Sequence, residues 1–552
     1  MAGVLPAVWN LSRVPSPAGP AGRAGGRYSP VAMSDYDAIV IGAGHNGLTA
    51  ATVMARGGLR VLCLEKNHFI GGMASTTELI RGYRFELAGS IQFPVPNQIF
   101  EDLDLGACPI YEPEVQSASI SEDGQPPIFL YSDPERLLEH LGETIGIEAV
   151  LGMAEVAAWA DAPARAIGRF DVRTPPKSLD EMWACAANET EREAIRTAMF
   201  GSVMDVVDRY LPDRSKHAPV RSMLAFLAVN STFRGPFSPG SAMCLAFALA
   251  SPGTATMSKV RGGLGTIADH LARLFEQHGG ELRRHAKVSR IVVEGGAVIG
   301  VELAEGEVAT APVVVSNLDP TTTFTQLLDA DSLPESFTSR VGAIDHRAAY
   351  FQAHFALRGL PEYRAPYEAL NDTTLGRNVT FFGTAEQMQQ DFEGCVRGQV
   401  PSSPSFNLQI PSLDDPTLAP EGMHAASSFA FYLPIADRET QGRLRDEMAE
   451  RIVAKIARAA PNFPDLIERQ LNYPAYTYEL MFGCAGGDFT HGLLQPEFMG
   501  PFRPGPTGWP DAPVPVEGLY LCGAGCHGGP GVTFIPGYNC GYAVLDGVSD
   551  RL

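Results

Sequence analysis

The protein has 552 residues, of which 45% are hydrophobic and 19% are charged, so the chain can bury a large core and is too apolar to be disordered. Its 42 Lys and Arg residues stand against 63 Asp and Glu residues, which gives a net charge of −21. A surface so acidic repels phosphate backbones, which excludes nucleic acid as a partner.

Residues 1–32 contain three arginines, five prolines and no acidic residue. An Arg-bearing, acid-poor N-terminus is typical of a transit peptide, but the prolines interrupt the amphipathic helix that such a peptide forms. We favour a translation start at Met33 and expect residues 1–34 to be a flexible tail. The nine cysteines form no dense framework, which favours a reducing compartment. We expect the cytoplasm, with the mitochondrial matrix as the alternative if the tail is a leader.

A dinucleotide-binding unit is predicted directly after this tail. Residues 36–41 form an apolar run of strand type, 48–57 a helical stretch and 60–64 a second strand. A G-x-G-x-x-G motif separates the first strand from the helix, and its glycines are Gly42, Gly44 and Gly47. This order predicts a Rossmann-type unit with phosphates bound at the helix N-terminus.

Each motif residue has a predicted role. Gly42 permits the tight turn, Gly44 lets the backbone approach a pyrophosphate, and Gly47 lets helix and strand pack closely. Glu65 ends the second strand, where a carboxylate accepts hydrogen bonds from ribose hydroxyl groups.

A second glycine pair, Gly71 and Gly72, lies shortly after Glu65 and is followed by Met73. A further close approach of backbone to cofactor at this offset indicates FAD rather than NAD, because FAD is the longer molecule. We therefore predict FAD as the cofactor and place Gly71, Gly72 and Met73 in its site.

Two later segments complete the predicted cofactor scaffold. Residues 256–324 contain an amphipathic helix followed by a run of short strands. A strand at 518–522 leads into a glycine-rich loop in which Gly523 and Gly531 are predicted to contact the cofactor. His527 in this loop is a candidate for a flavin contact, a proton relay or a loop hydrogen bond.

The first intervening segment, residues 77–255, is predicted to be largely helical, with helices at 180–187 and 192–210. The second segment, residues 325–505, contains an alternating strand at 347–357.

On the predicted strand, Tyr350, Gln352 and His354 share one face, and Phe351 and Phe355 lie on the other. One face is expected to meet substrate. The candidates for a catalytic role are Tyr350, His354, His491 and His527, and the sequence assigns a role to none of them.

The sequence resembles the phytoene desaturase-like FAD oxidoreductases, and within them the subgroup named for a pyridine nucleotide-disulfide oxidoreductase domain. The motifs that carry the resemblance lie at residues 37–48, 71–74, 261–265, 315–317 and 521–531. The resemblance implies an α/β fold (α+β overall), in which a Rossmann-like FAD-binding domain of glutathione-reductase type is interleaved with a substrate domain of mixed sheet and helices. It also implies that a backbone group of Val288 contacts the adenine.

The expected domain boundaries follow from these assignments. The FAD-binding domain comprises residues 35–76, 256–324 and 506–552. The substrate domain comprises residues 77–255 and 325–505.

The resemblance implies hydride transfer between flavin N5 and carbon–carbon bonds of a hydrophobic, isoprenoid or polyene-like molecule. The chain departs from polyene desaturases at 527–530, where it has His-Gly-Gly-Pro in place of His-Pro-Gly, and it lacks the cysteine pair of a disulfide reductase. One alternative is a flavin amine oxidase, although Cys526 stands where those enzymes carry an acid. The other is an FAD-bound interaction protein without catalytic activity.

No metal site is predicted, because Cys522 and Cys526 have neither zinc-site nor redox-pair spacing. No apolar run is long enough to span a bilayer. Peripheral membrane contact and a protein partner stay open, and the oligomeric state is not predicted.

Overall fold

Strand β1 (Ala38–Ile41) lies at the centre of a five-stranded parallel sheet, and all four of its side chains are buried. A strand that is covered on both faces needs apolar side chains throughout, and the run Ala-Ile-Val-Ile supplies them. The sheet order is β21 (Leu519–Leu521), β13 (Val314–Ser316), β1, β2 (Val61–Leu64) and β9 (Glu281–Arg283). Three stretches that are far apart in the sequence therefore build one sheet.

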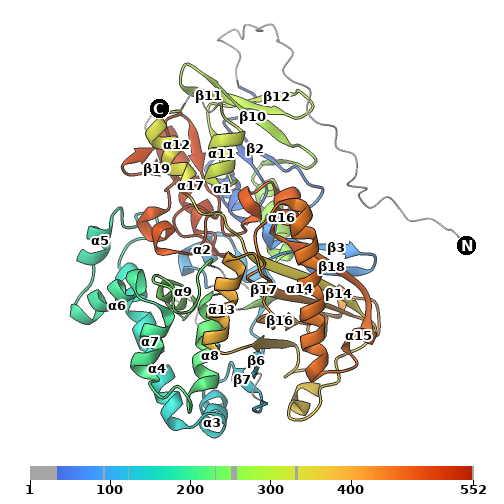
Figure 1. The fold of residues 1–552 in the computed structure, drawn as a ribbon. Helices are drawn as coiled ribbons and strands as arrows, with labels where there is room; N and C mark the ends of the chain where they lie inside the picture. The colour runs from blue at the N-terminus through green and yellow to red at the C-terminus, as the bar shows by residue number, and fades with distance from the viewer. Residues whose placement is uncertain are drawn as a thin grey trace, which may run out of the picture. The chain divides into compact units, whose positions relative to one another are not determined.

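The computed structural model describes residues 34–90, 94–121, 124–229, 232–249, 258–329 and 333–549 (Figure 1). From Asp35 onward the chain forms one compact unit. The two alternatives for the tail, a transit peptide or a start at Met33, concern residues that lie outside the described ones.

Different structures cover the two faces of the five-stranded sheet (Figure 1). One face carries three helices, α1 (His45–Arg56), α10 (Gly265–Gln277) and α17 (Ile535–Ser549). The other face carries an antiparallel meander of β10 (Val288–Glu294), β11 (Ala297–Leu303) and β12 (Val308–Thr310). Side chains alternate along β1, so Ala38 and Val40 pack against the helices while Ile39 and Ile41 pack against the meander.

A mixed sheet of seven strands is the second main layer. Its order is β18 (Ile467–Pro474), β14 (Tyr350–Leu357), β17 (His424–Phe431), β16 (Phe406–Gln409), β15 (Asn378–Phe382), β6 (Val115–Ser121) and β7 (Ile128–Tyr131). Strands β15 and β6 are parallel and the other neighbours are antiparallel. Strands β6 and β7 come from the segment predicted to be mainly helical, so that segment also extends the sheet.

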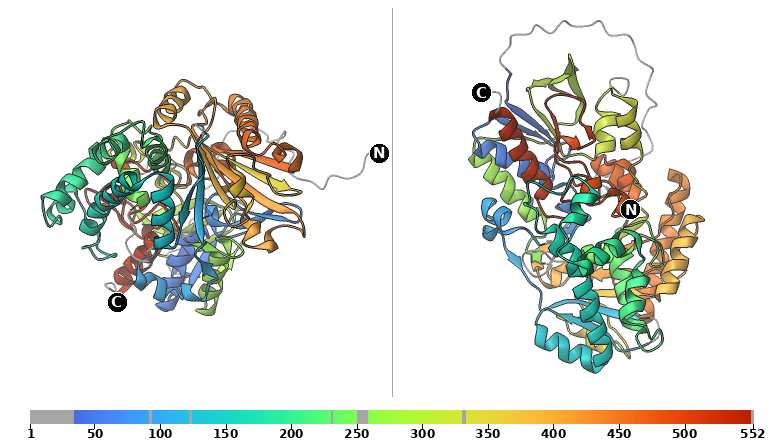
Figure 2. Two further views of the ribbon diagram at one scale, coloured as in Figure 1. Left: turned by 90° about the horizontal axis from the view of Figure 1, so that it is seen from below. Right: turned by 90° about the vertical axis from the view of Figure 1, so that its left-hand side faces the viewer.

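Helix α14 (Arg438–Ala459) covers one face of this sheet (Figure 2). Its buried residues Met448 and Ile452 share a core with Phe351 and Phe355 of β14. The predicted alternation is therefore confirmed for the phenylalanine face of β14.

The helices of the first intervening segment pack together beside the mixed sheet (Figure 1). They are α3 (Pro134–Thr144), α4 (Ile147–Ile167), α5 (Leu179–Ala184), α6 (Glu189–Phe200), α7 (Val203–Tyr210), α8 (Ala218–Val229) and α9 (Ala242–Leu249). The single helix expected at 192–210 is wrong, because the chain breaks at Gly201. Helix α7 then begins with a capping box, in which Ser202 and Asp205 each bind the other's backbone N–H.

The remaining regular elements connect the two sheets. The helices are α2 (Asn97–Asp102), α11 (Pro320–Gln326), α12 (Glu335–Gly342), α13 (Ala385–Val396), α15 (Phe463–Leu466) and α16 (Ala475–Phe482). The short strands are β3 (Thr76–Ile80), β4 (Tyr83–Glu86), β5 (Ile110–Tyr111), β8 (Lys259–Val260), β19 (Gly508–Trp509) and β20 (Ala512–Pro513). Among the described residues, no helix is both long and apolar enough to cross a membrane.

Candidate functional site

The first glycine motif forms a tight turn between β1 and α1. Gly42 has φ +93°, a conformation that favours glycine, and its N–H donates to the carbonyl of Leu64 at 2.8 Å. A Cβ added at Gly47 would overlap the carbonyl oxygen of Gly42. The helix can therefore approach the strand this closely only with glycine at position 47.

Asn317, at the end of β13, supports this turn from behind. Its Nδ2 donates to the carbonyl of Gly42 at 3.2 Å, and a Cβ added at Gly44 would lie 2.7 Å from the same Nδ2. Sequence reasoning assigned no role to Asn317. Its position in a motif directly after a buried strand was the available signal, because residues at the ends of parallel strands gather at one edge of the sheet.

Glu65 is buried at the end of β2, with an exposed fraction of 6%. Its carboxylate accepts hydrogen bonds from the N–H of Ala43 at 3.0 Å and from the N–H of Asn67 at 2.9 Å. Burial raises the pKa of Glu65, and the two backbone hydrogen bonds oppose that rise. The predicted ribose contact thus belongs to a residue that also fixes the glycine turn.

The second glycine pair packs directly on the first motif. Gly71 donates its N–H to the carbonyl of Ala43 at 2.8 Å, and a Cβ added at Gly72 would lie 3.3 Å from the Cα of Gly44. Both glycines have positive φ, at +98° and +59°. The structure therefore brings the two predicted glycine motifs together, and Met73 extends from them toward the aromatic cluster around Tyr350.

Buried polar atoms without partners gather at the start of α1. Asn46 is 1% exposed, and among the described residues neither its Oδ1 nor its Nδ2 has a hydrogen-bond partner. The same holds for Nε2 of His45 and Nδ1 of His491. Buried polar groups are normally hydrogen-bonded, so this cluster indicates a place for a polar ligand. Sequence reasoning missed His45 and Asn46, which occupy the variable positions of the glycine motif.

Both histidines at this place are held in the neutral form. Burial lowers the pKa of His45 to about 4, and the nearby His491 lowers it further, against a hydrogen bond to the Gly531 backbone. Burial also lowers the pKa of His491. A Cβ added at Gly523 would lie 3.1 Å from Nδ1 of His491, so the C-terminal loop reaches the same cluster.

His527 has a different environment in the same loop. Its Nδ1 lies 2.9 Å from the carbonyl oxygen of Gly500, and its N–H donates to the carbonyl of Pro504 at 2.9 Å. Burial lowers its pKa. Of the three alternatives for His527, the structure shows the loop hydrogen bond.

Arg503 joins this loop to the segment that carries His491. The guanidinium is buried and donates to the carbonyls of Phe498, Thr490, Gly492 and Ala524. Burial lowers the pKa of Arg503 to about 10, so the group stays positive at neutral pH. A fixed positive charge therefore lies directly beneath the C-terminal loop.

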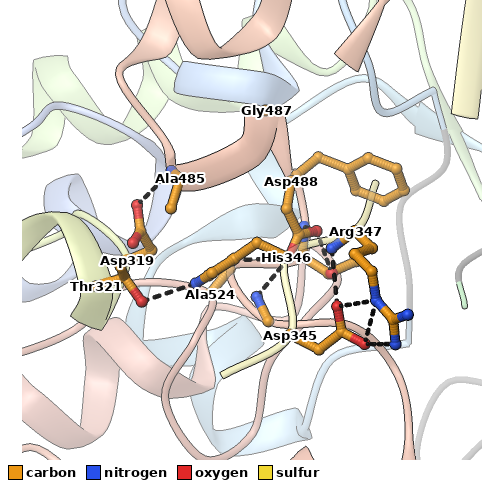
Figure 3. A network of polar contacts seen from close by, with 12 residues as sticks. Asp319, Thr321, Asp345, His346, Arg347, Ala485, Gly487, Asp488 and Ala524 are labelled. Atoms are coloured by element: carbon orange, nitrogen blue, oxygen red, sulfur yellow. Dashed lines mark hydrogen bonds and ion pairs between the residues drawn. The ribbon is translucent and has the colours of Figure 1, made fainter. Parts of the chain in front are cut away.

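Figure 3 shows the polar network next to this arginine. His346 lies between Thr321, whose Oγ1 is 2.8 Å from Nε2, and Asp488, whose Oδ2 is 3.2 Å from Nδ1. Asp319 receives the N–H of Ala485 at 3.1 Å. The network ties the end of the Rossmann sheet, the start of β14 and the loop before His491 to one another.

Tyr350 and His354 lie on the face of β14 opposite α14, as predicted. The Tyr350 hydroxyl donates to the carbonyl of Gly487 and accepts the N–H of Phe489 at 3.0 Å. The His354 ring has Nδ1 2.8 Å from Oγ of Ser427, and burial lowers its pKa to about 3.

Aromatic rings surround these two side chains. Tyr350 contacts the rings of Phe429, Tyr478 and Phe489, at centroid distances of 5.6, 5.8 and 4.6 Å. The result is an aromatic wall that meets the glycine motifs at Met73.

Val288 is the first residue of β10 and is buried. Two residues before it, Ala286 donates its N–H to the carbonyl of Glu65 at 2.8 Å. The segment that leads into β10 therefore runs beside the residue predicted to bind ribose, and the adenine contact of Val288 stays a prediction.

A model of the NAD(P)-binding Rossmann-like domain matches residues 40–104. Pyridine nucleotide-disulfide oxidoreductase domain-containing protein 2 of Mus musculus is 28% identical over 95% of this chain and 94% of its own length. A limonene dehydrogenase polypeptide of Castellaniella defragrans is 25% identical over 93% and 95% of the two chains. The neurosporene-forming phytoene desaturase of Cereibacter sphaeroides is 26% identical over 92% and 94%.

Solved structures show the same fold. Wild-type putrescine oxidase bound to putrescine superposes with a TM-score of 0.59 at 16% identity, over 94% of this chain and 99% of that chain. The Rossmann-like α/β fold and the resemblance to phytoene desaturase-like oxidoreductases are confirmed, and the chain is an oxidoreductase.

Proposed function

We propose that this protein is an FAD-dependent oxidoreductase that acts on carbon–carbon bonds of a hydrophobic, isoprenoid or polyene-like molecule. The observation that carries the cofactor assignment is the cluster of unpartnered buried atoms on His45, Asn46 and His491 among the described residues, directly beside the two glycine motifs.

The residues at the site fit FAD. The glycine turn at the start of α1 offers backbone N–H groups and a positive helix end to a pyrophosphate. Glu65 lies where a ribose would be bound, and the Gly71–Gly72 pair extends the open backbone toward the aromatic wall. Bound FAD supplies a ring system that accepts or returns a hydride at N5.

The protein's own groups then bind, orient and exclude water. The neutral rings of His45 and His491 can donate or accept hydrogen bonds without adding charge to the site. Arg503 supplies a fixed positive charge near the C-terminal loop, which would favour negative charge on a reduced cofactor.

The aromatic wall supports an apolar substrate. Tyr350, Phe429 and Phe489 offer ring faces, and the polar hydroxyl of Tyr350 is already bonded to backbone. Two relatives over nearly the full chain are named for isoprenoid molecules, limonene and phytoene. We extend that substrate class to this chain.

The first experiment is the anaerobic visible spectrum of the purified protein, after reconstitution with FAD. A flavin band at about 450 nm supports the cofactor, and its absence rejects the proposal. Bleaching by a polyene or monoterpene, with putrescine as the matched amine, then supports the substrate class. Bleaching by putrescine alone, with release of hydrogen peroxide, would instead assign the chain as an amine oxidase. A flavin that no donor bleaches would favour the non-catalytic alternative.

A further inference from the structure

A second cavity lies in the mixed-sheet region, away from the glycine motifs. Its volume is about 250 Å³, and it is enclosed by the ends of β6, β15 and α3 and by the start of β7 and α8. In Figure 1, α3, β6 and β7 lie in the lower part of the molecule, whereas α1 and β2 lie in the upper part. The cavity is therefore separate from the proposed cofactor site.

The strand arrangement makes this a reasonable place for a ligand. Strands β6 and β15 run parallel, with Ser121 paired to Phe382, and both residues line the cavity. Ligands of sheets with parallel strands bind outside the carboxyl ends of those strands, where backbone and side chains converge.

His217 is the decisive feature of the cavity wall. It is 1% exposed, and within the described part of the chain neither of its ring nitrogens has a hydrogen-bond partner. Its backbone is fixed, because its N–H donates to the carbonyl of Asp213 and its carbonyl accepts the N–H of Arg221, both at 3.0 Å. A buried imidazole held in this way needs a polar partner, and the cavity is where one can be placed.

The other lining side chains are polar but carry little net charge. Ser119, Ser121, Gln125 and Thr144 contribute hydroxyl and amide groups. Such a lining offers both donors and acceptors, as a polyhydroxylated ligand requires.

The charges at the cavity are already paired. Lys216 forms an ion pair with Glu148, whose other oxygen lies 3.9 Å from Nε2 of His217. The carboxylate of Asp213 accepts the backbone N–H groups of Ser215 and Lys216 at 3.1 and 2.8 Å. No unpaired charge among these residues calls for a charged ligand, so a neutral ligand fits best.

We propose that this cavity is a second binding site, which takes a small neutral polyhydroxylated molecule with the imidazole of His217 as its central hydrogen-bonding group. A cavity of about 150 Å³ holds a six-carbon ring, so a volume of about 250 Å³ suits about ten non-hydrogen atoms. Five-carbon polyols and pentoses have this size. The inference does not depend on the proposed flavin chemistry.

Saturation-transfer NMR on the full-length protein tests the site with xylitol, a five-carbon polyol, and with 1-pentanol, which keeps the carbon chain but loses four hydroxyl groups. We expect saturable binding of xylitol and none of 1-pentanol. His217→Phe should weaken xylitol binding at least about fivefold, because it removes both ring nitrogens from a buried site. The control His278→Phe changes an exposed residue at the end of α10 and should bind as wild type does.

Three results would overturn the proposal: no saturable xylitol signal in the wild type, equal binding of 1-pentanol, or wild-type affinity in His217→Phe. Thermal unfolding of each variant shows whether it is folded. If His217→Phe does not fold, Ser119→Val replaces it, since this change removes a lining hydroxyl group with only a small increase in volume. It should likewise weaken xylitol binding, and unchanged affinity in that variant would equally reject the site.

Discussion

Nδ1 of His346 lies 3.2 Å from Oδ2 of Asp488, and this pair joins the start of β14 to the loop that carries His491. Asp488 is fully buried and His346 nearly so. The carboxylate also accepts the backbone N–H groups of Thr490 and Gly492, at 2.8 and 2.6 Å. One buried ion pair therefore helps to hold the substrate sheet and the cofactor loops in register.

Replacement of His346 should strongly destabilise the fold. In His346→Gln the carboxylate of Asp488 stays buried but loses its cationic partner, and breaking such a pair costs about 3–5 kcal/mol. Urea unfolding measures the loss, with His278→Gln at an exposed site as the control. A loss below about 1 kcal/mol would mean that the pair contributes no more than a surface ion pair.

The same pair predicts how stability depends on pH. Burial alone would lower the pKa of His346, but the hydrogen bond to Asp488 and its charge raise it above 6.5 overall. For Asp488, burial favours a higher pKa, but His346 and the local hydrogen bonds lower it below 3.8.

The contribution of His346 is therefore complete below about pH 6.5 and is lost as pH rises through its raised pKa. That of Asp488 is present above its unfolded pKa and is lost as pH falls through its lowered pKa. We expect the difference in unfolding free energy between wild type and His346→Gln to be larger at about pH 6 than at about pH 9. An equal difference at both values would show that His346 is neutral in the fold.

The glycine motifs and the Rossmann unit were predictable because they are local: strand, turn, helix and acid follow one another within one short stretch. Gly42, Gly47 and Glu65 occupy the positions that their spacing indicated. The alternation on β14 was predictable for the same reason, since a period of two sets the faces of a strand.

The partners across the chain were not predictable. Asn317 touches the glycine turn only because β13 lies beside β1, and Arg503 binds Ala524 only because two loops meet in space. A polar residue in a loop gives no local sign of burial. The break at Gly201 was missed because helical periodicity continues on both sides of it.

Gly44→Val should abolish retention of flavin. The added side chain would collide with Nδ2 of Asn317, whose Cβ-to-nitrogen separation is already only 2.7 Å for the first carbon. The turn must then open, and its N–H groups no longer converge on a pyrophosphate. The flavin-to-protein absorbance ratio after gel filtration is the measurement. Gly142→Val in α3 is the control, because no described atom lies within 4 Å of a Cβ there, and stoichiometric flavin in Gly44→Val would contradict the site.

Glu65→Gln should lower both stability and affinity for FAD. Each oxygen of Glu65 accepts a backbone N–H, so the amide of glutamine would place a donor against a buried donor. One unsatisfied buried group costs about 1–3 kcal/mol. Urea unfolding and FAD titration are the measurements, and the control is Glu276→Gln on the exposed face of α10. Wild-type values for both quantities would show that Glu65 holds neither the turn nor the ribose.

Arg503→Lys should separate charge from geometry beneath the C-terminal loop. The guanidinium has five N–H donors and reaches four carbonyls, whereas a lysine ammonium has three donors and leaves at least one buried carbonyl without a partner. The variant also loses the planar group over the ring of Phe498. We expect a loss of about 1–3 kcal/mol for each carbonyl left unpaired, measured by urea unfolding, and weaker flavin retention because Ala524 is freed. Arg443→Lys, an exposed change on α14, should leave both unchanged. If Arg503→Lys matches wild type in both, then positive charge alone is what the loop needs from this position.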